Sequence, residues 1–186
     1  MDRKLPLYFI IGGTPTLDKD SFEVIWNGLQ LLKDTFLKDP YALETLHVSV
    51  IQVSSDAWSI DALTPIDRWR IPLLHPEGTG ELALGAAFKI LDYRISQEVI
   101  PKSLEFKGDF CPLVFIMVDS SPTDDWVNVT SSVLNRTHPH IGSCFMVLVG
   151  SDVKPSDFEQ VPSLNPVTFD DDITVKSRQF FRWVDQ

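Results

Sequence analysis

The chain has 186 residues, of which 44% are hydrophobic and 23% are charged, and its formal net charge at pH 7 is -10. This balance is typical of a soluble globular protein, and the length suits a single domain, 1–186, with a two-sided hydrophobic core. The negative charge argues against nucleic acid or a membrane surface as partner, because both would repel the protein. The apolar runs are far shorter than the roughly 20 residues that span a bilayer.

The cysteine content and the first residues predict a cytoplasmic protein. Cys111 and Cys144 each precede or open an apolar run, which predicts buried thiols in a reducing compartment. The opening residues, 1–13, lack the long apolar core and the cleavage site of a signal peptide.

The first half of the chain alternates between strand and helix patterns. Leu5–Ile11 is an apolar run that predicts a buried strand. Leu46–Val53 is apolar on both parities, which favours an inner strand covered on both faces. Ala57–Ile71, with Pro65 inside it and Pro72 just after it, favours an edge strand or hairpin. Between the first two strands, a helix is predicted by apolar residues at spacings of three and four, namely Phe22, Ile25, Leu29, Leu32 and Phe36, with Asp39-Pro40 at its end.

The second half continues the alternation. Gly78–Glu81 is expected to open a helix, and Leu113–Val118 forms a strand that ends at Asp119. Thr123 or Asp124 is expected to cap a short helix before the strand Cys144–Val149. The inward face of the helix after Gly78 is predicted to carry Leu84, Phe88, Leu91, Ile95 and Val99, and the small residues Gly85, Ala86 and Ala87 should let it approach the sheet closely.

The last part of the chain is less regular. Pro155–Pro166 is rich in proline, serine and acid, which predicts a surface connection with at most one helical turn. Apolar residues from Ile173 to Val184 then indicate a final amphipathic helix. The sequence His138-Pro139-His140 is interpreted as a turn rather than a metal site, because no third ligand accompanies it.

This order of elements predicts the fold class. Alternating strands and helices favour a doubly wound α/β fold, in which a mostly parallel central sheet with one antiparallel edge strand is covered by helices on both faces. In such sheets the carboxyl ends of the strands form the ligand crevice.

Three loops are candidates for that crevice: Gly12–Thr16, Gly78–Leu82 and Asp119–Asp125. A hard cation such as Mg²⁺ prefers carboxylate, hydroxyl and water oxygens. Asp119 with Thr14 and Thr16 would supply one carboxylate and two neutral oxygens, so any Mg²⁺ binding is expected to be weak and no metal or other cofactor is predicted.

Enzyme signatures are missing from the same loops. The glycines of Gly12-Gly13 lack the spacing of a phosphate loop or a dinucleotide fingerprint, and no Gly-x-Ser-x-Gly elbow occurs. We therefore predict a protein that is not an enzyme. The alternative is a small hydrolase or transferase that uses the crevice with Asp119 as its base.

Several stretches resemble the von Willebrand factor type A domain, and more closely its bacterial TerY-like branch, which is associated with tellurite resistance. The resemblance covers nearly the whole chain and lies in Leu5-Pro6-Leu7-Tyr8, Asp39 to Thr45, Leu84-Gly85-Ala86-Ala87, Pro112 to Phe115, Pro122 to Trp126 and Phe180 to Val184.

The resemblance also implies where a metal-ion-dependent adhesion site (MIDAS) would lie. The family's Asp-x-Ser-x-Ser motif falls on Gly12, Thr14 and Thr16, its threonine on Leu82, and its later aspartate on Asp119. Two expected ligands, one of them a carboxylate, are therefore replaced by residues that cannot bind a cation. This pattern predicts a degenerate, metal-free site.

The resemblance further implies a cytoplasmic protein-protein interaction module in tellurite-resistance or stress-response systems, with a kinase or phosphatase of the same system as candidate partner. A basic or hydroxyl-rich loop of that partner is expected to dock on a rim at the crevice. The rim residues are Gly12, Gly13, Thr14, Thr16, Glu81, Asp119, Ser120 and Ser121.

Overall fold

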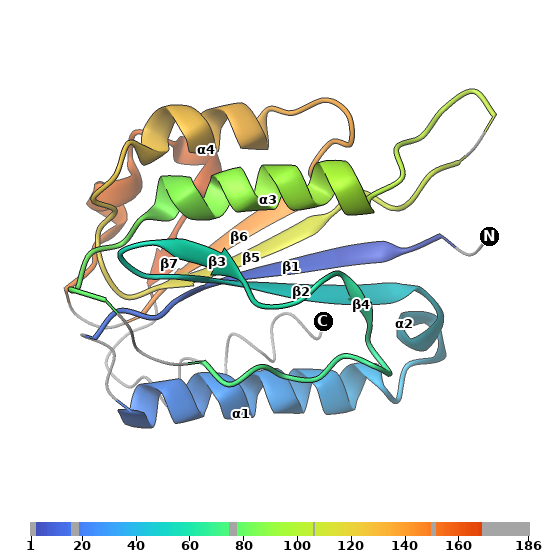
Figure 1. Ribbon diagram of the computed structural model, residues 1–186, viewed down its shortest axis with the longest axis horizontal. Coiled ribbons are helices and arrows are strands. Elements are labelled where there is room, and N and C mark those ends of the chain that lie inside the picture. Colours follow the sequence, from blue (N-terminus) through green and yellow to red (C-terminus); the bar gives the residue numbers. More distant parts are fainter. Residues whose placement is uncertain (1–2, 16–18, 75–77, 106, 150–151, 169–186) are drawn as a thin grey trace.

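The structure is a computed structural model that describes residues 3–15, 19–74, 78–105, 107–149 and 152–168. It has three layers, with the sheet lying between α1 on one face and α3 and α4 on the other (Figure 1). Within the described residues the elements are β1 (Leu5–Gly12), α1 (Lys19–Phe36), α2 (Pro40–Thr45), β2 (Leu46–Val53), β3 (Ala57–Ser59), β4 (Thr64–Pro65), α3 (Leu84–Glu98), β5 (Leu113–Val118), α4 (Trp126–Leu134), β6 (Ser143–Leu148), η1 (Pro155–Phe158), η2 (Pro162–Leu164) and β7 (Val167–Thr168).

The sheet confirms the predicted doubly wound α/β class. Its strand order is β3-β2-β1-β5-β6-β7, and β4 also pairs with β2. The strands β2, β1, β5, β6 and β7 run parallel, whereas β3 and β4 are antiparallel to β2. The expected single antiparallel edge strand is thus two short strands.

Asp61 explains why that edge is divided. Its carboxylate accepts hydrogen bonds from the Val50 N–H at 2.7 Å and from the Trp69 indole N–H at 2.8 Å. The side chain therefore takes the place of a backbone acceptor beside β2, and β3 and β4 pair on either side of it. Burial raises the pKa of the Asp61 carboxyl, and the hydrogen bonds from Val50 and Trp69 oppose that shift.

The core has two halves, one on each face of the sheet. Tyr8 and Ile10 of β1 pack in the half that contains α3 and α4, whereas Leu7, Phe9 and Ile11 pack in the half that contains α1. These five side chains are at most 3% exposed. Alternate residues of a strand point to opposite faces. A strand that is apolar at successive positions therefore packs side chains into both halves of the core.

Two helix boundaries differ from the prediction. Asp39-Pro40 starts the short helix α2 rather than only ending α1, because the Asp39 carboxylate accepts the Tyr41 N–H at 2.9 Å and proline suits a first helical position. The helix expected from Gly78 begins at Leu84. Gly78 and Gly80 have φ values of 95° and 91°, which a right-handed helix does not allow.

The prediction for Pro155–Pro166 was wrong. This segment contains two 3₁₀ turns rather than at most one, and it packs into the core instead of lying on the surface. Phe158, Val161 and Leu164 are 1%, 2% and 0% exposed. Their spacing of three residues is the period of a 3₁₀-helix, so the signal was present in the sequence. The final helix expected up to Val184 lies outside the described residues.

The cysteines differ in part from the expectation of buried thiols. Both are free, and Cys111 is exposed whereas Cys144 is partly buried. Burial raises the pKa of the Cys144 thiol to about 12. Among the described residues, no helix is both long enough and apolar enough to cross a membrane.

Phe158 provides a test of the packed tail. Its ring lies 5.7 Å from the ring of Trp126 in α4, so Phe158→Ala should lower the free energy of unfolding by about 3 kcal/mol through the cavity it leaves. Urea denaturation measures this value. The neighbouring exposed residue gives the control, because Glu159→Ala should leave stability unchanged. Equal stability of both variants would contradict the packing of this segment.

Candidate functional site

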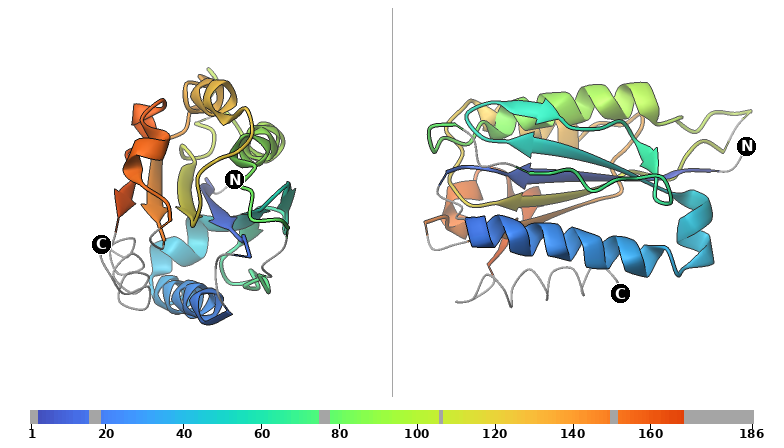
Figure 2. Two further views of the ribbon diagram at one scale, coloured as in Figure 1. Left: turned by 90° about the vertical axis from the view of Figure 1, so that its left-hand side faces the viewer. Right: turned by 60° about the horizontal axis from the view of Figure 1, so that its bottom comes forward.

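The position predicted for the crevice is the point at which β1 and β5 end. These strands are parallel neighbours, and the chain leaves β1 for α1 on one face but leaves β5 for α4 on the other. The left view of Figure 2 looks onto this end of the strands. Such a reversal is the topological switch point at which open α/β sheets bind ligands.

A buried hydrogen bond spans this switch point. The Thr14 hydroxyl donates to the Asp119 carboxylate, and the two side chains are only 0% and 5% exposed. A carboxylate removed from water requires donors within the protein. The structure therefore brings together two predicted site residues, but it buries them.

Gly12 allows the close approach of the two strand ends. A Cβ atom added at this position would lie 3.1 Å from the Asp119 Oδ1 atom and 3.1 Å from the Val118 Cα atom. Any side chain here would therefore crowd the carboxylate. An acid at position 12 would also place a second negative charge beside the first, which is costly without a bound cation.

The loop Gly78–Leu82 and the residue after it join this site through their backbone. The Leu82 carbonyl accepts the Thr123 N–H at 3.0 Å, and the Ala83 N–H donates to the Ser54 carbonyl at 2.7 Å. The Leu82 side chain is 0% exposed and belongs to the core half beneath α3 and α4. The three loops thus meet as predicted, and Leu82 contributes an apolar side chain.

Asp124 caps α3 rather than α4, which corrects the sequence prediction. Its two carboxylate oxygens accept the N–H groups of Gly85 and Ala86, each at 3.0 Å. The N-cap position of α3 is Ala83, which has no side chain that could accept these bonds. An uncapped helix start is the sequence signal that a remote acceptor is required.

Gly85 fits closely against the same loop. A Cβ atom added there would lie 2.8 Å from an Asp124 oxygen and 3.0 Å from the Trp126 Cα atom. The small residue therefore lets α3 approach the start of α4, whereas the sequence had suggested an approach to the sheet. Together with the Asp124 cap, this contact fixes the position of the loop that follows β5.

Ser121 links the crevice to η1. Its hydroxyl donates to the Asp157 carboxylate at 2.6 Å, and the Lys154 N–H donates to the same carboxylate at 2.9 Å. These bonds lower the pKa of the Asp157 carboxyl. The link is therefore present at neutral pH and is lost only as the pH falls through that lowered pKa.

The predicted rim is only partly accessible. Gly12, Gly13, Thr14 and Asp119 are buried. Among the described rim residues, Glu81 is exposed and Ser120 and Ser121 are partly exposed, whereas Thr16 lies outside the described residues.

The environment of Asp119 bears on catalysis and on metal binding. A general base must reach a substrate proton directly or through water, but this carboxylate is buried and already accepts the Thr14 hydroxyl. Within the described ranges, no group of three or more His, Cys, Asp or Glu residues is placed to hold a metal ion.

No family model and no curated protein sequence matches this chain. Solved structures do match it. Proximal thread matrix protein 1 from mussel byssus is 11% identical with a TM-score of 0.70, over 99% of this chain and 48% of that one. A structure of the same protein with a zinc-occupied MIDAS motif is 12% identical, with a TM-score of 0.67 and coverage of 99% and 48%.

A third structure, a von Willebrand factor type A protein from Catenulispora acidiphila, is 13% identical with a TM-score of 0.63, over 98% of this chain and 42% of that one. The chain thus spans less than half the length of each of these proteins. At such low identity the likeness establishes the fold alone. The chain has the fold of von Willebrand factor type A domains.

The cap on α3 can be tested by mutation. Asp124→Ala removes the acceptor of two helix N–H groups and should lower the free energy of unfolding by about 1 to 2 kcal/mol. Denaturant unfolding measures the change. The matched control is Asp125→Ala, because this adjacent acid is exposed and makes no capping bond to α4. If both variants lose the same stability, Asp124 does not cap α3.

Proposed function

We propose that this chain is a protein-protein interaction module whose MIDAS-like position is degenerate and functions without a metal ion. The observation that carries the proposal is the buried hydrogen bond from Thr14 to Asp119, which joins the ends of β1 and β5 at the position that the family resemblance implies for the MIDAS.

The residues around that bond do not fit a divalent cation. Of the three positions that the resemblance implies for acidic or threonine ligands, only Asp119 carries a side-chain oxygen. Position 12 has no side chain, and Leu82 is aliphatic and buried. Mg²⁺ prefers near-octahedral oxygen coordination with one or two carboxylates and several waters. The Thr14 hydroxyl already engages Asp119 Oδ2, and a Cβ atom at Gly12 would be crowded against Oδ1 at 3.1 Å.

The accessible part of the rim consists of Glu81, Ser120 and Ser121. The exposed Glu81 carboxylate suits a basic or hydroxyl-rich loop, and the net charge of -10 would attract such a loop at long range. The Ser120 Oγ atom is buried and the Ser121 hydroxyl donates to Asp157, so the two serines contribute surface beside Glu81 rather than hydroxyl groups directed at the partner. We propose this rim as the docking surface of the module.

We further propose that the protein is cytoplasmic and acts in the manner of TerY-like proteins in tellurite-resistance or stress-response systems, without enzyme activity. The support is the set of sequence stretches that resemble that branch, which includes Pro122 to Trp126 and Leu84 to Ala87. A kinase or phosphatase of the same system is the proposed partner.

Titration with cations tests the degenerate site. The wild-type protein should give no saturable heat with Mg²⁺ or Mn²⁺ at a Kd below about 1 mM in isothermal titration calorimetry. Thr14→Val should destabilise the protein by about 1 to 3 kcal/mol in the absence of metal, because it leaves a buried carboxylate without this donor. Tight binding that disappears in Asp119→Ala would overturn the metal-free proposal.

Affinity purification from the native host tests the docking rim. Glu81→Lys reverses one exposed charge and should abolish capture of a partner that the wild-type protein retains. Glu44→Lys reverses an exposed charge on α2, at the other end of the sheet, and should leave the capture unchanged. Retention of the same partner by Glu81→Lys would exclude this rim as the docking surface.

A further inference from the structure

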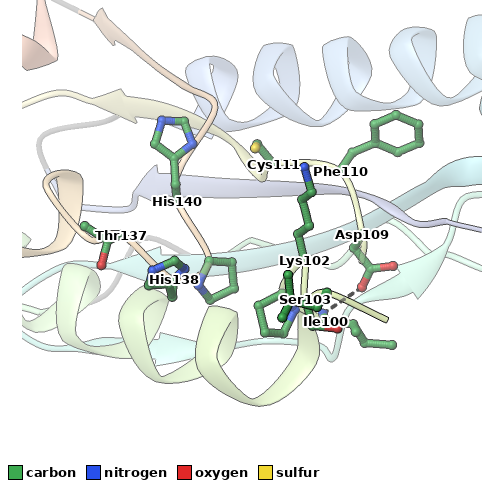
Figure 3. Close-up of a pocket in the computed structure, with 12 residues that line it drawn as sticks. Ile100, Lys102, Ser103, Asp109, Phe110, Cys111, Thr137, His138 and His140 are labelled. Atoms are coloured by element: carbon green, nitrogen blue, oxygen red, sulfur yellow. Dashed lines mark hydrogen bonds between the residues drawn. The ribbon is translucent and has the colours of Figure 1, made fainter. Parts of the chain in front are cut away.

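A cleft of about 500 Å³ lies at the opposite end of the sheet, where the parallel strands begin. One wall is the segment that leaves α3, and the other is the segment between α4 and β6. In Figure 3, Thr137 to His140 lie on one side of the view and Ile100 to Ser103 on the other, with Cys111 between them.

Hydrogen bonds fix the first wall. The Asp109 carboxylate accepts the Ile100 N–H at 2.8 Å and the Lys4 N–H at 2.9 Å, and it pairs with the Lys4 ammonium at 3.4 Å. Gly108 has a φ of 66°, and a Cβ atom there would lie 2.5 Å from the Lys102 nitrogen. This wall is therefore built before any partner binds.

Arg136 supports the second wall. Its guanidinium donates to the Asp92 carboxylate of α3 at 2.8 Å and to the His138 carbonyl at 3.4 Å. The turn that carries His138 and His140 is thereby tied to the helix that leads into the first wall. Both walls are therefore connected to α3.

The cleft carries uncompensated positive and hydrogen-bonding groups. Within the described part of the chain, the side chains of Lys102, His138 and His140 make no hydrogen bond or ion pair, and all three residues are exposed. The Asp109 carboxylate, the acid of the lining, is neutralised by Lys4. Lys102 thus gives the cleft an exposed cation with no acid partner among the described residues, in a chain with a net charge of -10.

The same cleft presents apolar surface. Ile100 and Leu104 are 43% and 107% exposed. Phe110 is also a lining residue, and its ring is held by Tyr41, edge-on at 6.4 Å between ring centroids, and by the Arg3 guanidinium, 3.9 Å from the ring centroid. An apolar surface beside a few polar groups is the usual composition of a specific binding site.

We propose that this cleft is a second docking site, which binds a partner segment containing an aromatic or aliphatic side chain flanked by carboxylates. The apolar side chain would lie against Ile100, Leu104 and Phe110, and a carboxylate would accept bonds from Lys102 and the imidazole N–H groups of His138 or His140. The inference rests on the proposed role as an interaction module, and it adds the chemistry of the partner.

Charge favours a short acidic peptide segment over a nucleic acid as the occupant of the cleft. An anionic segment meets the Lys102 ammonium locally, and a short peptide carries too few charges to be repelled strongly by the whole protein at physiological salt. A nucleic acid would instead present a continuous row of phosphates to a chain of net charge -10.

NMR titration of the full chain with a matched pair of peptides tests the proposal. Acetyl-Glu-Phe-Glu-amide carries both features, and acetyl-Gln-Phe-Gln-amide has the same shape without charge. The acidic peptide should shift the backbone amide signals of the non-proline residues in 100–104 and 137–140, and its Kd should rise with salt. The neutral peptide should bind more weakly.

Two variants that each remove one lysine charge complete the design. Lys102→Ala should weaken binding of the acidic peptide by about two- to fivefold, which is the range for an exposed ion pair. Lys89→Ala removes an exposed charge from α3 outside this cleft and should leave the Kd unchanged.

Three results would overturn the proposal: no saturable shifts, equal binding of both peptides, or equal effects of both variants. Self-association at the concentrations used, detected by sedimentation and mapped to the same amides, would also overturn it in favour of a second copy as the occupant. These readouts concern the end of the sheet that is opposite to Glu81. Failure here is thus distinguishable from failure of the rim or of the metal-free site.

Discussion

The hydrogen bond between Thr14 and Asp119 is the constraint on which the crevice depends. It joins the ends of the two central strands, β1 and β5, at the point where the chain turns to opposite faces of the sheet. A buried carboxylate at this position needs a donor or a cation, since its desolvation would otherwise destabilise the fold. The Thr14 hydroxyl is one such donor, and Gly12 leaves the space in which the two strand ends can approach.

The two ends of the sheet consequently differ in what they offer a partner. At the carboxyl ends of the strands, polar groups are directed inward: Thr14 bonds to Asp119, Asp124 caps α3 and Ser121 bonds to Asp157. At the opposite end, the Asp109 and Arg136 side chains hold a cleft whose lysine and histidines have no internal partners among the described residues. The first end engages most of its polar side chains in internal bonds and leaves Glu81 exposed, whereas the second retains a lysine and two histidines that can bond to another molecule.

Much of the fold could be predicted because burial imposes a regular pattern on the sequence. Leu46–Val53 and Leu113–Val118 have the predicted bounds, since both strands are covered on both faces; the first is apolar on both parities and the second is apolar throughout. The errors have local causes. Asp39-Pro40 is compatible with a helix end and with a helix start, and only the bond from the Tyr41 N–H distinguishes them. The proline-rich composition of Pro155–Pro166 hid the three-residue spacing of Phe158, Val161 and Leu164, whose burial requires a neighbouring helix such as α4.

The amino-acid sequence by itself determined the alternation of strands and helices and the absence of ligand oxygens at Gly12 and Leu82, because residue type and spacing are local properties. Only the tertiary structure decided that Thr14 donates to Asp119, 105 positions away, and that both side chains are buried. It also decided that Asp124 caps α3, 38 and 39 positions earlier in the chain. The physical reason is that a polar side chain can pair with any donor or acceptor within reach, and the packing of the sheet and helices determines which one that is.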